Sequence, residues 1–168
     1  MRSITSSTSS GSLPWMPCGY PGSTIKKAVV DALTNGRVSV SANPFAPRVE
    51  LYADLDGDSK MDMMMGDNIK ATGKPVKFRV QLTGKTVADS TYTISVIKNG
   101  NPFSTLQATG KQHILEFTDT PATLGRTYYR VEVTGPSTPY PQVPGSMALS
   151  GNMVGLSNPI YFNFDPDF

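Results

Sequence analysis

Apolar and polar side chains alternate strictly along residues 75–82, PVKFRVQL. Alternation with period two places one set of side chains on each face of a β-strand, so this stretch predicts a strand with one buried and one solvated face. Comparable runs, rich in β-branched and aromatic residues, recur between turn signals elsewhere in the chain. They lie at residues 37–41, 49–54, 91–98, 102–107, 112–119, 127–135 and 155–164.

The residues between these runs indicate how the strands connect. Asn99-Gly100 follows the run at 91–98 directly, and this dipeptide favours a tight hairpin because both residues tolerate a positive φ. Short strands separated by turn signals every 8–12 residues or so are typical of a β-sandwich. We therefore predict a mainly β fold, an immunoglobulin-like β-sandwich.

One segment near the N-terminus has a different period. In residues 23–36, STIKKAVVDALTNG, Ser23 or Thr24 can accept a hydrogen bond from the free amides of a first helical turn, and Asn35-Gly36 supplies a left-handed stop. Apolar side chains recur between them at helical spacing. They are Ile25, Ala28, Val29, Ala32 and Leu33. The pattern predicts one N-terminal amphipathic α-helix ahead of the sandwich.

Length and composition fit a single domain. The chain has 168 residues, of which 38% are apolar and 17% charged, with 15 glycines and 14 prolines; such a chain can bury one real core. Residues 1–22 begin with a serine- and threonine-rich stretch that lacks the apolar core of a signal peptide, so we expect a flexible lead-in and linker. Residues 23–168 are expected to form the helix and the sandwich, with a long proline-containing loop at 135–155.

Several classes of function are disfavoured. The net charge is only +2 and the basic residues are scattered, so we expect no nucleic-acid partner. No apolar run approaches the roughly 20 residues that span a bilayer, so we expect no membrane span. The chain has one histidine, His113, and one cysteine, Cys18, too few for a zinc cluster, and it has no serine-nucleophile or phosphate-loop motif. We therefore do not expect an independent enzyme.

The segment DLDGDSKMD, residues 54–62, is the one candidate site. Calcium takes six to eight oxygen ligands, and helix-flanked calcium loops supply them from positions 1, 3, 5, 7 and 9. Four carboxylates crowded into one loop repel one another, at a cost on the order of 1 kcal/mol per close pair, unless a cation binds. We therefore predict a structural Ca²⁺ site whose ligands are Asp54, Asp56, Asp58, the backbone carbonyl of Lys60, and Asp62.

Two residues depart from that loop pattern. Ser59 stands where such loops carry a glycine, and Met65 stands where they carry a bidentate glutamate. The alternative is an acidic hairpin tip without a metal, which joins the strand at 49–54 to a short strand in the methionine run 63–65. In that short strand Met63 and Met65 share one face.

Two resemblances extend this picture. The segment at 54–62 resembles the Asp-x-Asp-Gly-Asp-Gly-x-x-Asp calcium loops of FG-GAP and VCBS-type repeats in extracellular proteins, with serine in place of the second glycine. About residues 17–162 resemble the C-terminal region of PHP-type (polymerase and histidinol phosphatase) metallohydrolases of the CehA/McbA kind. The matches that keep order and spacing are Ala32-Leu33, Gly36-Arg37, Asn43-Pro44-Phe45, Gly66-Asp67, Tyr129-Arg130 and Ser157-Asn158-Pro159-Ile160-Tyr161.

The second resemblance implies a role without catalysis. In that family a histidine-rich barrel holds the metal ligands and the phosphoester-cleaving residues, and none of them transfers to a position of this chain. The resemblance implies a C-terminal accessory domain of a larger, phosphoesterase-like metal-dependent hydrolase, for which an extracellular or periplasmic location is favoured. Its expected partner is the neighbouring catalytic domain, contacted through Trp15, Met16, Tyr20 and the methionine run 63–65.

A second function stays open at this point. A calcium-stabilised extracellular module could bind carbohydrate or protein through exposed aromatic rings. The stacking candidates for such a module are Trp15, Tyr128, Tyr129 and Tyr140.

Overall fold

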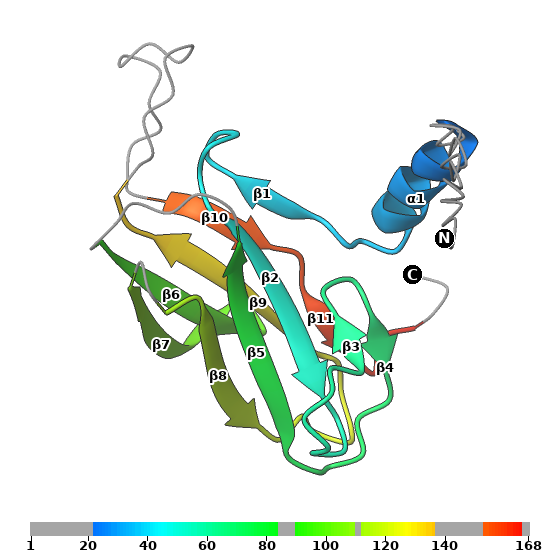
Figure 1. The fold of residues 1–168 in the computed structure, drawn as a ribbon. Helices are drawn as coiled ribbons and strands as arrows, with labels where there is room; N and C mark the ends of the chain where they lie inside the picture. The colour runs from blue at the N-terminus through cyan, green and yellow to red at the C-terminus, as the bar shows by residue number, and fades with distance from the viewer. Residues whose placement is uncertain (1–21, 84–89, 110–111, 137–152, 166–168) are drawn as a thin grey trace, which may run out of the picture.

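The computed structural model describes residues 22–83, 90–109, 112–136 and 153–165, which form one helix, α1 (Gly22–Thr34), and two β-sheets (Figure 1). The larger sheet contains β1 (Ser39–Ser41), β4 (Asn68–Ile69), β6 (Thr91–Lys98), β7 (Asn101–Thr109), β9 (Thr127–Thr134), β10 (Met153–Ser157) and β11 (Ile160–Phe162). The smaller sheet contains β2 (Arg48–Asp54), β3 (Met63–Met64), β5 (Val76–Thr83) and β8 (Ile114–Asp119). Most of the expected lead-in and of the loop at 135–155, together with Cys18, lies outside the described residues.

The strand order is that of an immunoglobulin-like sandwich. In one sheet β2, β5 and β8 are neighbours, and in the other β7, β6 and β9 follow one another before β10 and β11. The chain changes sheet between β5 and β6, between β7 and β8, and between β8 and β9, which produces Greek-key connections. The predicted mainly β fold with one N-terminal helix is confirmed.

The core lies between the two sheets and follows the alternation of the sequence. On β5 the four apolar residues from Val76 to Leu82 are buried, while the intervening polar residues are only half-buried, as the pattern predicts. The same alternation holds on β9. The ring of Phe78 stacks on Phe117 with 4.8 Å between centroids and lies 4.5 Å from the ring of Tyr129, so it joins the two sheets.

The hairpin predicted at Asn99-Gly100 connects β6 to β7. Asn99 has φ 52° and Gly100 has φ 82°, the pair of positive values that a type I′ turn requires. The Asn99 side chain also accepts a hydrogen bond from the backbone N–H of Tyr128 at 2.9 Å, which ties the turn to β9. Pro102 lies in β7, an edge strand of its sheet, where a missing N–H is tolerated.

The predicted single strand at 155–164 is wrong, because the segment forms two strands. β10 and β11 both pair with β9 but are separated by Asn158 and Pro159. Proline has no N–H to continue a ladder, and the backbone N–H of Asn158 instead donates to the carbonyl of Val38 at 3.1 Å. The break turns β11 toward β4, with which it pairs in parallel.

The C-terminal end of α1 is fixed by a Schellman motif. Gly36 adopts φ 65°, its N–H donates to the carbonyl of Leu33 at 3.1 Å, and the N–H of Arg37 donates to the carbonyl of Ala32 at 2.8 Å. These bonds satisfy carbonyl groups that the helix end would otherwise leave free. The stop predicted at Asn35-Gly36 is therefore confirmed.

Three segments distant in sequence meet at this helix end, and we call this meeting point the junction. The side-chain amide of Asn158 donates to the carbonyl of Gly36 at 2.7 Å, and the N–H of Gly66 donates to the carbonyl of Pro159 at 2.7 Å. Gly66 has φ 96°, and a Cβ added there would collide with the backbone of Asn35 and Gly36. The junction therefore needs glycine at position 66.

The apolar face of α1 is exposed to solvent. Its large apolar side chains are between 54% and 62% exposed: Ile25, Val29, Val30 and Leu33. Figure 1 shows α1 set to one side of the two sheets, joined to them through the segment that leads into β1. The helix itself is confirmed, but its amphipathic pattern does not face the core of this sandwich.

A polar bridge crosses the sandwich beside the aromatic core. Asp119 on β8 accepts a hydrogen bond from the Tyr129 hydroxyl of β9 at 2.6 Å, and the Lys98 ammonium of β6 lies 2.5 Å from the same carboxylate oxygen. Burial raises the pKa of Asp119, but the hydrogen bonds from Lys98 and Tyr129 outweigh it and hold that pKa below 3.8. Burial, and then Asp119, raise the pKa of Tyr129 far above its usual range, so its hydroxyl stays a donor.

Tyr129→Phe tests this bridge. Removing a hydrogen bond to this half-buried carboxylate should lower the free energy of unfolding at pH 7 by about 1.5–3 kcal/mol. Because the folded pKa of Asp119 is lowered, the stabilisation is present above about pH 4 and is lost as the pH falls through the folded value, so the difference from wild type should shrink in acid. Urea unfolding between pH 7 and pH 2 measures both effects.

The neighbouring tyrosine supplies the control. Tyr128 is half-buried and its hydroxyl donates no hydrogen bond to any of the described residues, so Tyr128→Phe should change stability by less than about 0.5 kcal/mol. Equal losses for the two variants would show that the bridge contributes nothing specific.

Candidate metal centre

The acidic segment forms the tip of a hairpin between β2 and β3, at the end of the smaller sheet (Figure 1). β2 ends at Asp54, and the chain returns in register, with Ala53 opposite Met63. The N–H of Asp62 donates to the carbonyl of Ala53 at 2.9 Å, which closes the loop. The hairpin predicted around this segment is confirmed.

Three of the predicted ligands converge in this loop. Asp54, Asp56 and Asp58 each offer a carboxylate oxygen, and these oxygens all lie within 4.8 Å of one another. Asp54 is only 1% exposed, whereas Asp56 and Asp58 are open to solvent. Oxygen donors from carboxylates are the ligands that hard divalent cations such as Ca²⁺ prefer. The arrangement can therefore supply three ligands from one side, with the outer positions left to water or backbone carbonyls.

The same carboxylates hold the loop in shape. One oxygen of Asp54 accepts from the N–H of Gly57 at 2.7 Å, and the other accepts from the N–H of Ser59 at 3.0 Å. Asp56 accepts from the N–H of Asp58 at 3.0 Å. These are the local side-chain-to-backbone bonds by which aspartate stabilises turns. Asp54 therefore serves the loop as a hydrogen-bond acceptor whether or not it also binds an ion.

The Lys60 side chain and Asp62 each have another partner in the loop. The Lys60 ammonium lies 2.8 Å from Asp58, and this hydrogen bond is the main cause of the lowered pKa of Asp58. Asp62 accepts from the N–H of Leu55 at 2.8 Å, and it is not among the three converging carboxylates. The lysine side chain partly neutralises the cluster and would compete with a cation for Asp58.

Positive backbone angles show where the loop turns. Gly57 has φ 82° and Ser59 has φ 70°. Ser59 therefore occupies a left-handed conformation that costs a residue with a side chain roughly 1–2 kcal/mol. Ser59 stands where the resembled loops carry glycine, and its backbone conformation is one that favours glycine.

Most of the contact residues expected from the sequence are buried or lie outside the described residues. Met63 and Met65 share a buried face, as predicted, so these two residues cannot form the expected methionine contact surface, whereas Met64 is half-buried. Tyr129 is fully buried and cannot stack on a ligand, whereas Tyr128 is half-buried. Trp15, Met16, Tyr20 and Tyr140 lie outside the described residues.

The structure also shows a pocket beside the loop that sequence reasoning missed. Asp56 and Gly57 of the loop line it, together with residues 69–72 and 74–76 from the segment that leads from β4 into β5. Lys70 and Lys74 line it, but two lysines four residues apart in a turn-rich segment give no signal that distinguishes them from ordinary surface lysines. Only the folding of distant segments onto one another identifies the site.

The chain matches no protein-family model and no curated protein sequence. In the part that the structure describes, no helix combines the length and the apolar character needed to cross a membrane.

Asp54→Ala separates the structural role of the loop from metal binding. In the presence of a chelator, the variant leaves the N–H groups of Gly57 and Ser59 without their acceptor, so we expect a loss of about 1–3 kcal/mol in the free energy of unfolding. Asp58→Ala removes an exposed carboxylate and should cost clearly less under the same conditions. Urea unfolding of both variants measures this, and equal losses would contradict the assignment of Asp54 as the acceptor that shapes the loop.

Proposed function

We propose that this chain is a non-catalytic accessory domain that packs against a neighbouring catalytic domain of a PHP-like, phosphoesterase-like metal-dependent hydrolase. The observation that carries the proposal is the exposed apolar face of α1. An isolated helix of 13 residues is marginal in water, and an amphipathic helix is normally stabilised by burying its apolar stripe. The four large apolar residues of α1 are more than half exposed, so the helix is suited to pack against a neighbouring domain.

The junction supports the resemblance on which this choice of partner rests. Three of the motif matches are distant from one another in the sequence: Gly36-Arg37, Gly66-Asp67 and 157–161. In the fold they contact one another, through the bonds of Asn158 and Gly66 described above and an ion pair at 3.3 Å between Arg37 and Asp67. Matched segments that contact one another support the resemblance better than scattered matches, because all of them serve to hold the same junction together.

The acidic loop is proposed to bind a structural Ca²⁺. Its three converging carboxylates repel one another, and only one of them has a lysine partner in the described structure. A divalent ion would remove this repulsion and fix the hairpin tip that ends β2. The ion would have no catalytic role in this proposal, because the chemistry of the resembled family belongs to the barrel.

A surface aromatic cluster favours the second candidate, a calcium-stabilised binding module. The ring of Tyr161 lies 6.4 Å from the ring of Tyr128 and 5.0 Å from the ring of Phe164, and all three side chains are half-buried. Arg126 lies over Phe164 at 5.5 Å. Partly exposed rings beside a cation can stack on a sugar or a peptide. This cluster replaces the predicted Tyr129 as the place where such a ligand would bind.

Hydrogen exchange of α1 tests the accessory role. In the 168-residue chain, the α1 amides should exchange rapidly because little apolar burial stabilises the helix. In the complete protein encoded by the gene, they should be protected, and Val29→Asp with Leu33→Asp should remove that protection. Lys27→Asp, which lies on the polar side of the helix and also changes the charge by two units, is the matched control and should retain it.

Other results would reject this role. A gene that encodes no histidine-rich barrel ahead of this segment contradicts the proposed partner, and a gene that encodes repeated sandwiches or a surface anchor supports the binding module instead. Phosphoester hydrolysis by the 168-residue chain, abolished by a chelator, would exclude both candidates.

Thermal unfolding with and without Ca²⁺ tests the metal. At a free concentration of a hundred times its dissociation constant, the ion should stabilise the folded chain by about 2.7 kcal/mol and raise the midpoint by several degrees relative to chelator. Asp58→Ala should abolish the difference, whereas Asp31→Ala, an exposed aspartate on α1, should retain it. Identical midpoints in calcium and chelator would reject the site.

A further inference from the structure

A pocket of about 550 Å³ opens beside the acidic loop, within the size range of small-molecule sites. Four segments of the chain form it: the acidic loop, residues 69–76, the segment after β8, and β11. Its apolar lining includes Leu55, Val76 and Phe162. Phe162 is buried in the core and forms a rigid floor, since its ring also packs on Phe78 and Tyr129.

Two cations line this apolar hollow. Lys70 and Lys74 are exposed, and the described structure pairs neither of them with an acidic side chain. Asp56, from the acidic loop, is the one acidic residue of the lining. Two lysines against one carboxylate leave the pocket with one net positive charge, next to an apolar floor.

We propose that this pocket binds a small amphipathic anion, an organic carboxylate or sulfonate with an aromatic or branched aliphatic body. The apolar body would cover Leu55, Val76 and Phe162, and the acidic group would lie between the ammonium groups of Lys70 and Lys74. Small-molecule sites combine these elements, a mostly apolar surface and a few polar groups that fix orientation. A neutral sugar fits less well, because the lining offers two mobile cations and few fixed hydrogen-bonding groups.

The pocket shares a wall with the proposed metal loop, and this part of the inference rests on the proposed calcium function. Ca²⁺ at Asp54, Asp56 and Asp58 would neutralise the carboxylate of Asp56, which raises the net charge of the pocket lining from one to two. The anion should then bind more tightly with calcium present, and by linkage calcium should bind more tightly with the anion present.

Fluorescence titration of the 168-residue chain with 1-anilinonaphthalene-8-sulfonate tests the pocket. Lys70→Gln with Lys74→Gln should weaken binding roughly tenfold, the effect of two exposed charge contacts, and should leave binding of the uncharged N-phenyl-1-naphthylamine unchanged. Both lysines are on the surface, so the variant should fold.

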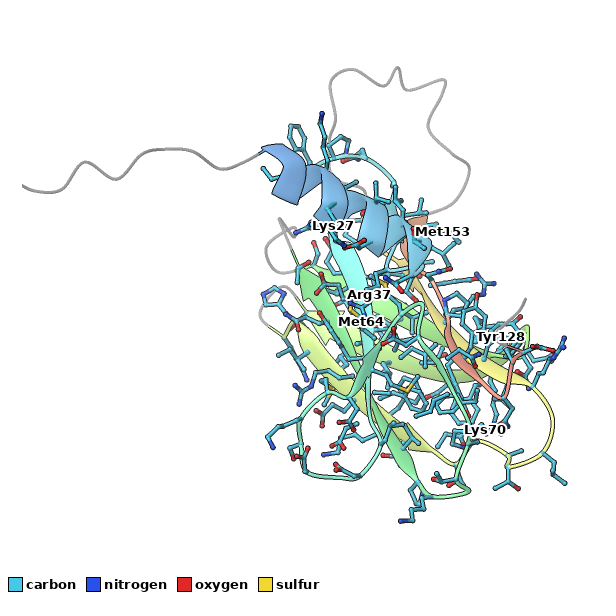
Figure 2. The ribbon with its side chains drawn as sticks, turned by 90° about the vertical axis from the view of Figure 1, so that its right-hand side faces the viewer. Lys27, Arg37, Met64, Lys70, Tyr128 and Met153 are labelled. Carbon is cyan, nitrogen blue, oxygen red and sulfur yellow. The ribbon has the colours of Figure 1, made fainter. Side chains whose placement is uncertain are left out.

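The apolar face of α1 is the competing site for this probe, and Lys26→Gln with Lys27→Gln on that helix is the matched control. Figure 2 shows Lys27 on α1 well separated from Lys70, so the two variants report on different places. The control should bind the probe like wild type. Unchanged binding by the pocket variant, or an equal loss in the control, would overturn the proposal.

The calcium arm separates the two proposals. Tighter binding of the sulfonate in Ca²⁺ than in chelator supports the coupling. If the lysine variant weakens binding equally in both conditions and wild type binds equally in both, the anion pocket stands and its coupling to calcium is rejected. If thermal unfolding shows calcium binding but the lysines have no effect on the probe, the metal site stands and the pocket is rejected.

Discussion

The packing of Phe78 between the two sheets is the contact on which the rest of this structure depends. Its ring, on β5, stacks on Phe117 of the same sheet and meets Tyr129 and Phe162 of the other. Because β2 pairs with β5 along its whole length, this contact also fixes where β2 ends and the acidic loop begins. Phe162 in turn lines the pocket beside the acidic loop. One aromatic cluster therefore positions both candidate sites.

The two sites occupy one end of the sandwich and share residues. Asp56 belongs to the converging carboxylates and also lines the pocket, so its charge acts on both. Electrostatic effects at such an exposed end are screened by salt within roughly 10 Å at ordinary ionic strength, and only groups this close can influence one another strongly. The exposed helix face is formed by a different part of the chain, so contact with a partner and binding of ions need not interfere.

The parts of this molecule that were predictable from sequence are those set by local chemistry. Alternation located β5 and β9, Asn99-Gly100 located a hairpin, Gly36 ended the helix, and the aspartate spacing located a loop in which three carboxylates meet. The remainder depends on contacts between distant segments. The break at Pro159 depends on the hydrogen bonds from Asn158 to Gly36 and Val38. The pocket requires four segments of the chain to come together. Leu33 is exposed because the two sheets do not pack against its face of the helix.

The junction has a consequence for how orientation is transmitted through the molecule. Gly36, Gly66 and Asn158 fix the direction in which α1 leaves the sandwich. They do so through the hydrogen bond from the Asn158 side chain to the Gly36 carbonyl and through close backbone contact, not through the helix's own side chains. The orientation of any protein bound to the apolar face of α1, relative to the two sheets, would therefore be set by the junction at the C-terminal end of the helix. A substitution at Asn158 could therefore change the direction of α1 relative to the two sheets without changing the apolar face of the helix.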